Sequence, residues 1–224
     1  MAAASGSIVG MTTNVDECRQ VYDNWANNYE KDVNEWGYNM PDEVASLLNK
    51  HLSTDKQDRN LTILDAGAGD GLSGLALHKY FPSSSSMYQT KTTIIGTDIS
   101  AQMLQIAKQR GCYSSVQEVD LNELPLPFED DTFDAISCVG VMTYVDPTKS
   151  LLQEFCRITK PGGYICYTHR TDKMKLFQDE EDRLESDKYW KSIEKCGPIA
   201  YLPNHADFGD KIQAVIYVFQ RLKR

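Results

Sequence analysis

Apolar positions along the chain change from helical spacing to strand-like runs. Val21, Trp25 and Tyr29 recur every four residues, which predicts one face of a helix near the start of the sequence. The segment 40–52 (MPDEVASLLNKHL) has the same kind of spacing, and Pro41 followed by two acidic residues marks its beginning. Two helices are therefore expected before residue 55.

From residue 61 onward, short apolar runs alternate with helical segments. Strands are predicted at 61–67, 92–98, 114–120, 132–141 and 164–169. Helices are predicted from Leu72, over 101–110 with Ser100 as the cap and Gly111 as the stop, and from Asp146-Pro147 up to KPGG at 160–163. Strands separated by helices indicate βαβ units and a doubly wound parallel sheet.

The remaining segments are less regular. Residues 173–195 are highly charged and helical in type, which suits either a lid or a solvated surface helix. The segment 212–220 (IQAVIYVFQ) is a strand with no helix after it. The serine run 83–86 is expected to be a loop insertion, and the small, polar residues 1–13 are expected to be a disordered tail.

Composition narrows the class of protein. A chain of 224 residues is long enough for one α/β domain and too short for two ordinary ones. Hydrophobic residues make up 41% and charged residues 25%, as in soluble globular proteins. The net charge of −9 repels a phosphate backbone, so we expect no nucleic-acid partner.

The six cysteines include no C-x-x-C pair, and several lie inside apolar runs. This pattern indicates reduced, buried thiols, with neither a disulfide framework nor a metal site. The first residues lack the basic and apolar regions of a secretory signal, and no run approaches the roughly 18 apolar residues that span a membrane. We therefore expect a cytoplasmic protein without a membrane partner.

Candidate ligand-binding residues follow the ends of the predicted strands. They are Gly67, Gly69 and Gly71 after the first strand, Asp98 at the end of the second, Asp120 at the end of the third, and Val139 and Gly140 at the end of the fourth. In an open α/β sheet, ligands bind beyond the carboxyl ends of the strands. These residues are therefore expected to share one site.

The glycine-rich stretch 64–74 (LDAGAGDGLSG) is compatible with two kinds of cofactor. Residues 69–74 match the G-x-G-x-x-G turn that binds a dinucleotide. However, Asp98 follows Gly71 by more than the roughly 20 residues of that fingerprint. Asp65 also places a carboxylate before the glycines, which disfavours a pyrophosphate and suits a phosphate-free ligand with an ammonium group. An NAD(P)-linked oxidoreductase remains the alternative.

Four segments occur in the order ILDAGAGDG (63–71), IIGTDIS (94–100), VDLNELPLPFEDDTFDAISCVGVMTYV (119–145) and ITKPGG (158–163). This series resembles the motifs of class I S-adenosylmethionine-dependent methyltransferases. With VYDNWANNYEKDV (21–33) and RITKPGGYICYTHRTD (157–172), the chain looks similar to the Williams–Beuren-region methyltransferase-like family. The resemblance implies a Rossmann-like α/β fold, doubly wound and seven-stranded, with a mostly parallel sheet and an antiparallel C-terminal strand. We expect a single methyltransferase domain over 14–224, with N-terminal helices in 14–55, and the charged segment 171–197 is either a lid or a surface helix.

The resemblance also implies S-adenosylmethionine as cofactor, with S-adenosylhomocysteine as product, and a set of contacts. Asp65 and the backbone of Gly67, Ala68 and Gly69 would face the methionine moiety, and Asp98 would hold the ribose. Ile99 and Met103 would flank the adenine, Asp120 and Leu121 would meet its edge beside Val139, and Trp25 and Tyr29 would close over the cofactor. Asp70 replaces the threonine that is usual in the glycine motif, and we expect it to point to solvent or to a helix start.

The methyl acceptor is less well defined. Tyr144 and His169, near the ends of the fourth and fifth strands, are the candidate catalytic residues. The stretch 138–144 (CVGVMTY) lacks the Asn/Asp-Pro-Pro-aromatic motif of methyltransferases that act on nucleobase or glutamine amino groups, which favours a small-molecule acceptor. Tyr22, Trp36, Tyr38, Trp190 and Tyr201 suit either a pocket or cage for such a molecule, or the ordinary core. Methylation at N, O or S stays open, as do the oligomeric state and a non-catalytic role in which the chain binds the cofactor and acts as a partner protein.

Overall fold

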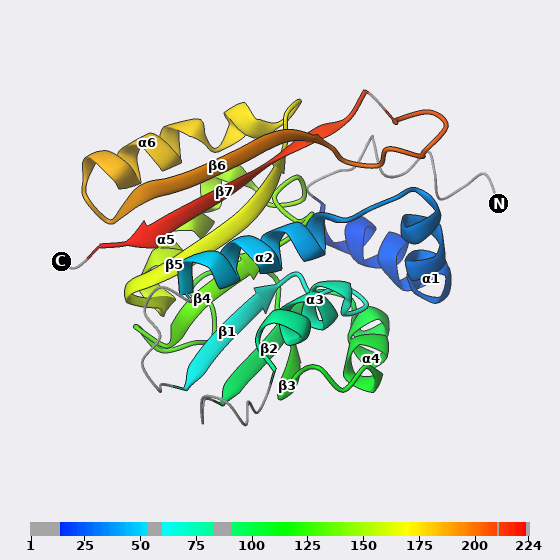
Figure 1. Cartoon of the computed structure of the whole chain (residues 1–224), viewed down its shortest axis with the longest axis horizontal. Helices are drawn as coiled ribbons and strands as arrows, with labels where there is room; N and C mark the ends of the chain where they lie inside the picture. The colour runs from blue at the N-terminus through cyan, green and yellow to red at the C-terminus, as the bar shows by residue number, and fades with distance from the viewer. Residues whose placement is uncertain (1–13, 53–59, 83–90, 210, 223–224) are drawn as a thin grey trace.

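A seven-stranded sheet in the order β3-β2-β1-β4-β5-β7-β6 forms the centre of the protein (Figure 1). The computed structural model describes residues 14–52, 60–82, 91–209 and 211–222, so the predictions for 1–13 and 83–86 lie outside the described residues. The strands are β1 (Leu61–Ala66), β2 (Thr92–Asp98), β3 (Ser115–Glu118), β4 (Phe133–Cys138), β5 (Thr159–Arg170), β6 (Trp190–Ala200) and β7 (Gln213–Arg221).

Every strand pair in the sheet is parallel except those made by β7, which runs antiparallel to both β5 and β6. The predicted seven-stranded, mostly parallel sheet with one antiparallel C-terminal strand is therefore confirmed. The order of the strands reverses between β1 and β4, and ligands bind beside such a switch point in doubly wound sheets.

Helices cover both faces of the sheet (Figure 1). The α-helices are α1 (Val15–Glu35), α2 (Met40–Leu52), α3 (Leu72–Tyr80), α4 (Ala101–Gln109), α5 (Leu151–Ile158) and α6 (Gln178–Ser186), with 3₁₀ turns η2 (Pro147–Lys149) and η3 (Met174–Leu176). Apolar side chains of α2 and α3 pack with one face of the central strands, and those of α5 and α6 pack with the other. All residues of β4 are buried, as expected for a central parallel strand.

Two sequence-based expectations need correction. The charged segment 173–195 is helical only as far as Ser186, because Trp190–Ala200 forms the edge strand β6. Most side chains of β6 are not buried, and charged residues are favoured on an edge strand because they prevent pairing with another chain. The helix expected from Asp146-Pro147 is divided: Asp146 caps the short turn η2, and α5 begins at Leu151, after Ser150 with a positive φ of 58°.

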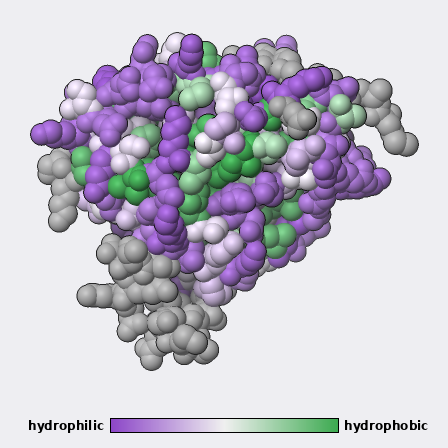
Figure 2. Space-filling view, turned by 45° about the horizontal axis from the view of Figure 1, so that its top comes forward, coloured by the Kyte–Doolittle hydropathy of each residue, from purple (hydrophilic) through white to green (hydrophobic). Residues whose placement is uncertain are grey.

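The face shown in Figure 2 is mostly hydrophilic, with hydrophobic residues gathered near its centre. In the described parts of the chain, the exposed large hydrophobic residues are Leu75 and Leu176, so most other apolar side chains are at least partly covered. None of the described helices combines the length and apolar character needed to cross a membrane. The six cysteines are free thiols, and all but the half-buried Cys196 are buried.

Candidate functional site

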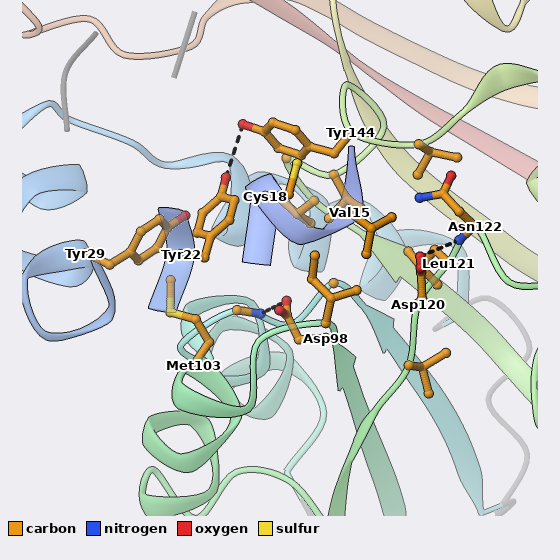
Figure 3. A pocket seen from close by; sticks show the side chains of 18 residues that line it. Val15, Cys18, Tyr22, Tyr29, Asp98, Met103, Asp120, Leu121, Asn122 and Tyr144 are labelled. Carbon is orange, nitrogen blue, oxygen red and sulfur yellow. Dashed lines mark hydrogen bonds between the residues drawn. The ribbon is translucent and has the colours of Figure 1, made fainter. Parts of the chain in front are cut away.

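A cavity with about 710 Å³ of empty space lies at the carboxyl edge of the parallel strands, beside the switch point (Figure 3). We call it the main cavity. Its walls come from α1, from the strand ends of β1 to β4 and from the loop after β4. The lining residues are Val15, Cys18, Tyr22, Tyr29, Gly67, Gly69, Asp98, Ile99, Met103, Val119, Asp120, Leu121, Asn122, Val139, Gly140, Val141, Tyr144 and Val145.

The glycine-rich loop after β1 forms one wall of the main cavity. The backbone N–H groups of Gly67 and Ala68 both donate to the carbonyl oxygen of Thr97, at 2.8 and 2.7 Å, so the loop is fixed against the end of β2. Gly67 has φ +77°, and a Cβ there would lie 2.2 Å from Cγ2 of Val141. Gly69 has φ +54°, and a Cβ there would meet nothing within 4 Å. The loop thus needs glycine at Gly67 for packing, and at Gly69 it leaves open space beside the cavity.

Asp98, at the end of β2, presents a fixed carboxylate to the main cavity. Its Oδ2 accepts a hydrogen bond from Gly69 N at 2.8 Å, and its Oδ1 accepts one from Ser100 N at 2.9 Å. Burial raises the pKa of Asp98, and the backbone donors partly offset this effect because they favour the ionised form. Ser100 also caps α4 by accepting from Met103 N, which positions Ile99 and Met103 beside the carboxylate.

A second carboxylate, Asp120, lies across the main cavity after β3 (Figure 3). Its Oδ1 accepts a hydrogen bond from the backbone N–H of Asn122 at 2.8 Å, which fixes the turn that carries Leu121. Val139 completes this part of the lining from the end of β4. Most of the predicted cofactor-binding residues are thus brought together here; Trp25, Asp65 and Ala68 are the ones that do not line the main cavity.

Asp65 lies behind the glycine-rich loop and is 0% exposed. Its Oδ2 accepts hydrogen bonds from Ser73 Oγ at 2.5 Å and from the Tyr113 hydroxyl at 2.6 Å, while its buried Oδ1 has no hydrogen-bond partner in the structure as described. Burial raises the pKa of Asp65 to about 6, although the two hydroxyl donors act in the opposite direction. The carboxylate therefore ties the loop to α3 and to the segment before β3.

The sequence suggested that Asp70 points to solvent. In the structure its side chain is buried, with 2% of the residue exposed. Its carboxylate lies 2.5 Å from Arg110 Nη2, and Nε of Arg110 donates to the Asp70 carbonyl oxygen. The same guanidinium also bonds Glu30 on α1, at 3.2 and 3.3 Å. The expectation of a helix start was correct, because Leu72 N donates to Asp70 Oδ1 at 3.4 Å. Arg110 explains the error: a cation 40 residues away in sequence pairs with this carboxylate and partly offsets the cost of burying it, although burial still raises the pKa of Asp70.

Helix α1 supplies the outer wall of the main cavity. Val15, Cys18, Tyr22 and Tyr29 point into it from one side of the helix (Figure 3). From the sequence, Tyr29 was expected to lie over the cofactor, whereas Val15 and Cys18 were not expected in the site. The signal was present in the spacing, since residues three and four apart lie on one face of a helix. Trp25 lies on a neighbouring face, where its Nε1 donates to Asp32 at 2.7 Å.

A smaller, mostly aromatic cavity adjoins the main cavity. We call it the aromatic cavity, and Tyr22, Tyr29 and Tyr144 line both. Its remaining lining residues are Trp25, Val33, Trp36, Tyr38, Tyr201 and Leu202. The Tyr22 hydroxyl donates to the Tyr144 hydroxyl at 3.1 Å where the two cavities meet. Of the aromatic residues considered from the sequence, Trp190 does not line the aromatic cavity; its ring stacks on Phe219 in the core at 3.9 Å.

The two candidate catalytic residues have different surroundings. Tyr144 lies at the junction of the cavities, and burial raises the pKa of its hydroxyl, which therefore stays protonated near neutral pH. His169 is buried in β5, where its ring packs edge-on against Phe177 and its Nδ1 lies 3.2 Å from the Arg170 carbonyl oxygen. Burial lowers the pKa of His169. It lines neither cavity.

The sequence of the chain is similar to those of known methyltransferases. Residues 64–167 match the family described as "Methyltransferase domain". The human methyltransferase-like protein 27 is 30% identical over 177 residues, which cover 77% of this chain and 67% of the relative. The ubiquinone/menaquinone biosynthesis C-methyltransferase of Desulfotalea psychrophila is 33% identical over 103 residues, covering 45% of this chain and 38% of the relative.

A similar fold occurs in a crystal structure of geranyl diphosphate C-methyltransferase from Streptomyces coelicolor A3(2), in complex with Mg²⁺, geranyl diphosphate and S-adenosyl-L-homocysteine. The TM-score is 0.58 at 16% identity, and the match covers 80% of this chain and 78% of that one. At this identity, the likeness concerns the fold. The chain spans about two thirds of the human relative and less than half of the bacterial one.

Proposed function

Because the chain belongs to the class I S-adenosylmethionine-dependent methyltransferases, we propose that it methylates a small molecule that binds next to the main cavity. S-adenosylmethionine is the cofactor of this class.

The residues of the main cavity fit this cofactor. Gly67 and Gly69 leave backbone, not side chains, along one wall, and a Cβ at Gly69 would project into open space. Asp98 and Asp120 are carboxylates, and the described lining residues include no Lys or Arg. These carboxylates can accept hydrogen bonds from ribose hydroxyls and an adenine amino group and attract a cationic ligand, and they would repel the pyrophosphate of NAD(P).

When bound, S-adenosylmethionine supplies an activated methyl group, so the protein itself needs little covalent chemistry. The proposed tasks of the chain are to orient the acceptor and to exclude water. Holding two reactants in line lowers the activation barrier by roughly 7–11 kcal/mol. Tyr22 and Tyr144, at the junction of the cavities, remain un-ionised because burial raises the pKa of each. They are therefore assigned to hydrogen bonding and positioning.

The observation that carries the small-molecule proposal is the common wall of the two cavities, made by Tyr22, Tyr29 and Tyr144. The aromatic cavity is the smaller of the two, so a ligand group that it holds must be small. The net charge of −9 disfavours nucleic acid, and the free, mostly buried thiols fit the proposed cytoplasmic location.

Two measurements test the proposal. Calorimetry with S-adenosylhomocysteine and, separately, with NADH should give binding only for the homocysteine product; binding of NADH alone would contradict the cofactor assignment. Incubation with methyl-labelled S-adenosylmethionine and a fraction of metabolites below about 1 kDa should then move label into a small molecule. Label found only in a protein or nucleic-acid fraction, or no transfer despite tight binding, would overturn the small-molecule proposal.

A further inference from the structure

The aromatic cavity is lined mostly by aromatic side chains. Besides the three shared tyrosines, Trp25 and Trp36 come from α1 and its C-terminal end, while Tyr38 and Tyr201 follow α1 and β6. The rings of Trp25 and Trp36 lie 5.6 Å apart between centroids, and those of Tyr38 and Tyr201 lie 5.2 Å apart. Apart from that of Tyr201, these rings also pack with Val33 as a small hydrophobic cluster.

Hydroxyl groups gather where the aromatic cavity meets the loop after β4. The Tyr38 and Tyr201 hydroxyls would lie 2.8 and 3.0 Å from a Cβ at Gly140, and the Tyr22–Tyr144 pair lies at the same junction. The loop itself is fixed because Gly140 N donates to Thr168 Oγ1 at 2.8 Å. Burial raises the pKa of both Tyr38 and Tyr201, so these phenols offer hydrogen bonds without carrying charge.

The charge around the aromatic cavity favours a cation. Its described lining includes no Lys or Arg. Asp32 accepts the Trp25 Nε1–H at 2.7 Å, and Asp98 acts on Tyr29, whereas the charge of Asp70 is paired with Arg110. Arg170 acts on Tyr144 and Tyr201 but does not line the aromatic cavity, and Asp172 binds its guanidinium at 2.8 and 3.0 Å. Ring faces with carboxylates behind them attract positive charge.

We propose that the aromatic cavity is the acceptor subsite and that the acceptor is an amine, whose nitrogen becomes positively charged as it is methylated. This inference rests on the proposed function. In the reaction, the lone pair of the neutral amine nitrogen forms the new N–C bond. The C–S bond breaks, and its electron pair stays on sulfur as the thioether of S-adenosylhomocysteine. The positive charge moves from sulfur to nitrogen, and the product formed from a primary or secondary amine acceptor later releases a proton to solvent.

The ring faces account for this preference. A cationic nitrogen over the face of an aromatic ring is attracted by the ring's negative face. The rings therefore stabilise the methylated nitrogen more than the neutral amine from which it forms, which is the differential binding that catalysis needs. A phenolate, enolate or carboxylate acceptor would instead place negative charge against ring faces and near Asp32, with no lining cation to compensate.

A ligand series tests the preference on the protein saturated with S-adenosylhomocysteine. The probes are choline, its uncharged isostere 3,3-dimethylbutan-1-ol and the anion 3,3-dimethylbutanoate, measured by calorimetry and tryptophan fluorescence. Trp25 and Trp36 line the aromatic cavity and the third tryptophan, Trp190, lies in the core, so fluorescence reports on the site. We expect choline to bind at least about tenfold more tightly than the alcohol. Equal affinities, binding of the anion alone or binding of none of the three would overturn the inference.

Paired variants distinguish ring faces from apolar volume. Tyr201→Phe keeps the ring and should retain choline affinity within about threefold, whereas Tyr201→Leu should weaken it about fivefold or more. Trp36→Phe and Trp36→Leu form a second pair if either Tyr201 variant fails to fold. All four should bind S-adenosylhomocysteine like the wild type, because neither residue lines the main cavity. Equal losses in the Phe and Leu variants would contradict the inference. If the wild type does not bind S-adenosylhomocysteine at all, the proposed function itself is contradicted.

Discussion

The two cavities share a wall but are built in different ways. The main cavity is formed largely by residues at the ends of consecutive strands, which place the carboxylates Asp98 and Asp120 among mostly apolar side chains. The aromatic cavity consists of large side chains from α1, from the turn after it, from the loop after β4 and from the turn after β6. The main cavity depends on where the parallel strands end at one edge of the sheet. The aromatic cavity depends on how segments far apart in the sequence pack together.

This difference implies different responses to mutation. Backbone that passes close to a ligand tolerates no added side chain, so changes in the main cavity should have large effects. Ring faces can be replaced by other rings with little effect.

Gly67→Ala should have the largest effect. The added Cβ would lie 2.2 Å from Cγ2 of Val141, and the backbone has φ +77°. The left-handed conformation costs about 1–2 kcal/mol, and overpacking about 1–3 kcal/mol more. We expect the free energy of unfolding to fall by about 2–5 kcal/mol in urea titrations, and affinity for S-adenosylhomocysteine to fall about a hundredfold or more.

Gly111→Ala is the matched control for this variant. Gly111 has a similar φ of +69°, but a Cβ there would meet nothing within 4 Å. The control should therefore lose only the conformational part, about 1–2 kcal/mol, and should keep its affinity for S-adenosylhomocysteine. If both variants lose the same stability and affinity, close packing at Gly67 is not the cause.

Asp65→Asn should change how stability depends on pH. The pKa of Asp65 rises from an ordinary 3.8 to about 6 in the folded protein, because the side chain is buried. The folded state therefore holds the proton more tightly than the unfolded state, and the resulting stability is fully present below about pH 4 and lost as the pH rises through 6. A shift of this size corresponds to about 3 kcal/mol.

The measurement compares urea unfolding of the wild type and Asp65→Asn between pH 4 and 7. The asparagine keeps an oxygen that can accept from Ser73 and Tyr113, so packing is preserved while the titration is removed. The wild type should lose about 3 kcal/mol relative to the variant over this range. Parallel stability curves would show that Asp65 does not titrate with a raised pKa.

Asp98→Ala tests the proposed ribose contact in the main cavity. Hydrogen bonds to a charged acceptor contribute about 1.5–3 kcal/mol, so affinity for S-adenosylhomocysteine should fall at least about tenfold by calorimetry. Asp98→Asn keeps one acceptor for Gly69 N or Ser100 N and should lie between the alanine variant and the wild type. An unchanged affinity in Asp98→Ala would refute the ribose assignment.

The contrast between the cavities also explains what the sequence could predict. Strand ends are local features, so the positions of Gly67, Asp98 and Asp120 at one edge followed from the order of strands and helices. Trp25, which is expected to close over the cofactor, lines the aromatic cavity and not the main cavity, because it lies one helical face away from Tyr22 and Tyr29. Its partner Asp32 lies seven residues further along α1, and the hydrogen bond between them is not evident in the sequence.

Long-range partners account for the other errors. Asp70 was expected toward solvent because Arg110, which binds it, is far away in sequence. The charged residues of β6 suggested a helix, since an edge strand with one buried tryptophan shows little apolar alternation. The lid expected over 171–197 stays a prediction: no residue of this segment lines either cavity, and Leu184 and Trp190 belong to the core.

Tyr144→Phe is expected to have the smallest effect, and it tests the shared wall directly. The variant removes the hydrogen bond from Tyr22, worth about 0.5–1.5 kcal/mol, and keeps the ring. Affinity for S-adenosylhomocysteine should change by no more than about threefold, and transfer of label to the acceptor should keep its dependence on pH, since burial raises the pKa of this phenol. Tyr22→Phe breaks the same hydrogen bond but leaves the Tyr144 hydroxyl in place. If Tyr144→Phe alone lowers transfer about a hundredfold and flattens the pH profile, Tyr144 acts as a general base. The shared wall would then take part in the reaction, and its role would not be limited to shape and ring contacts.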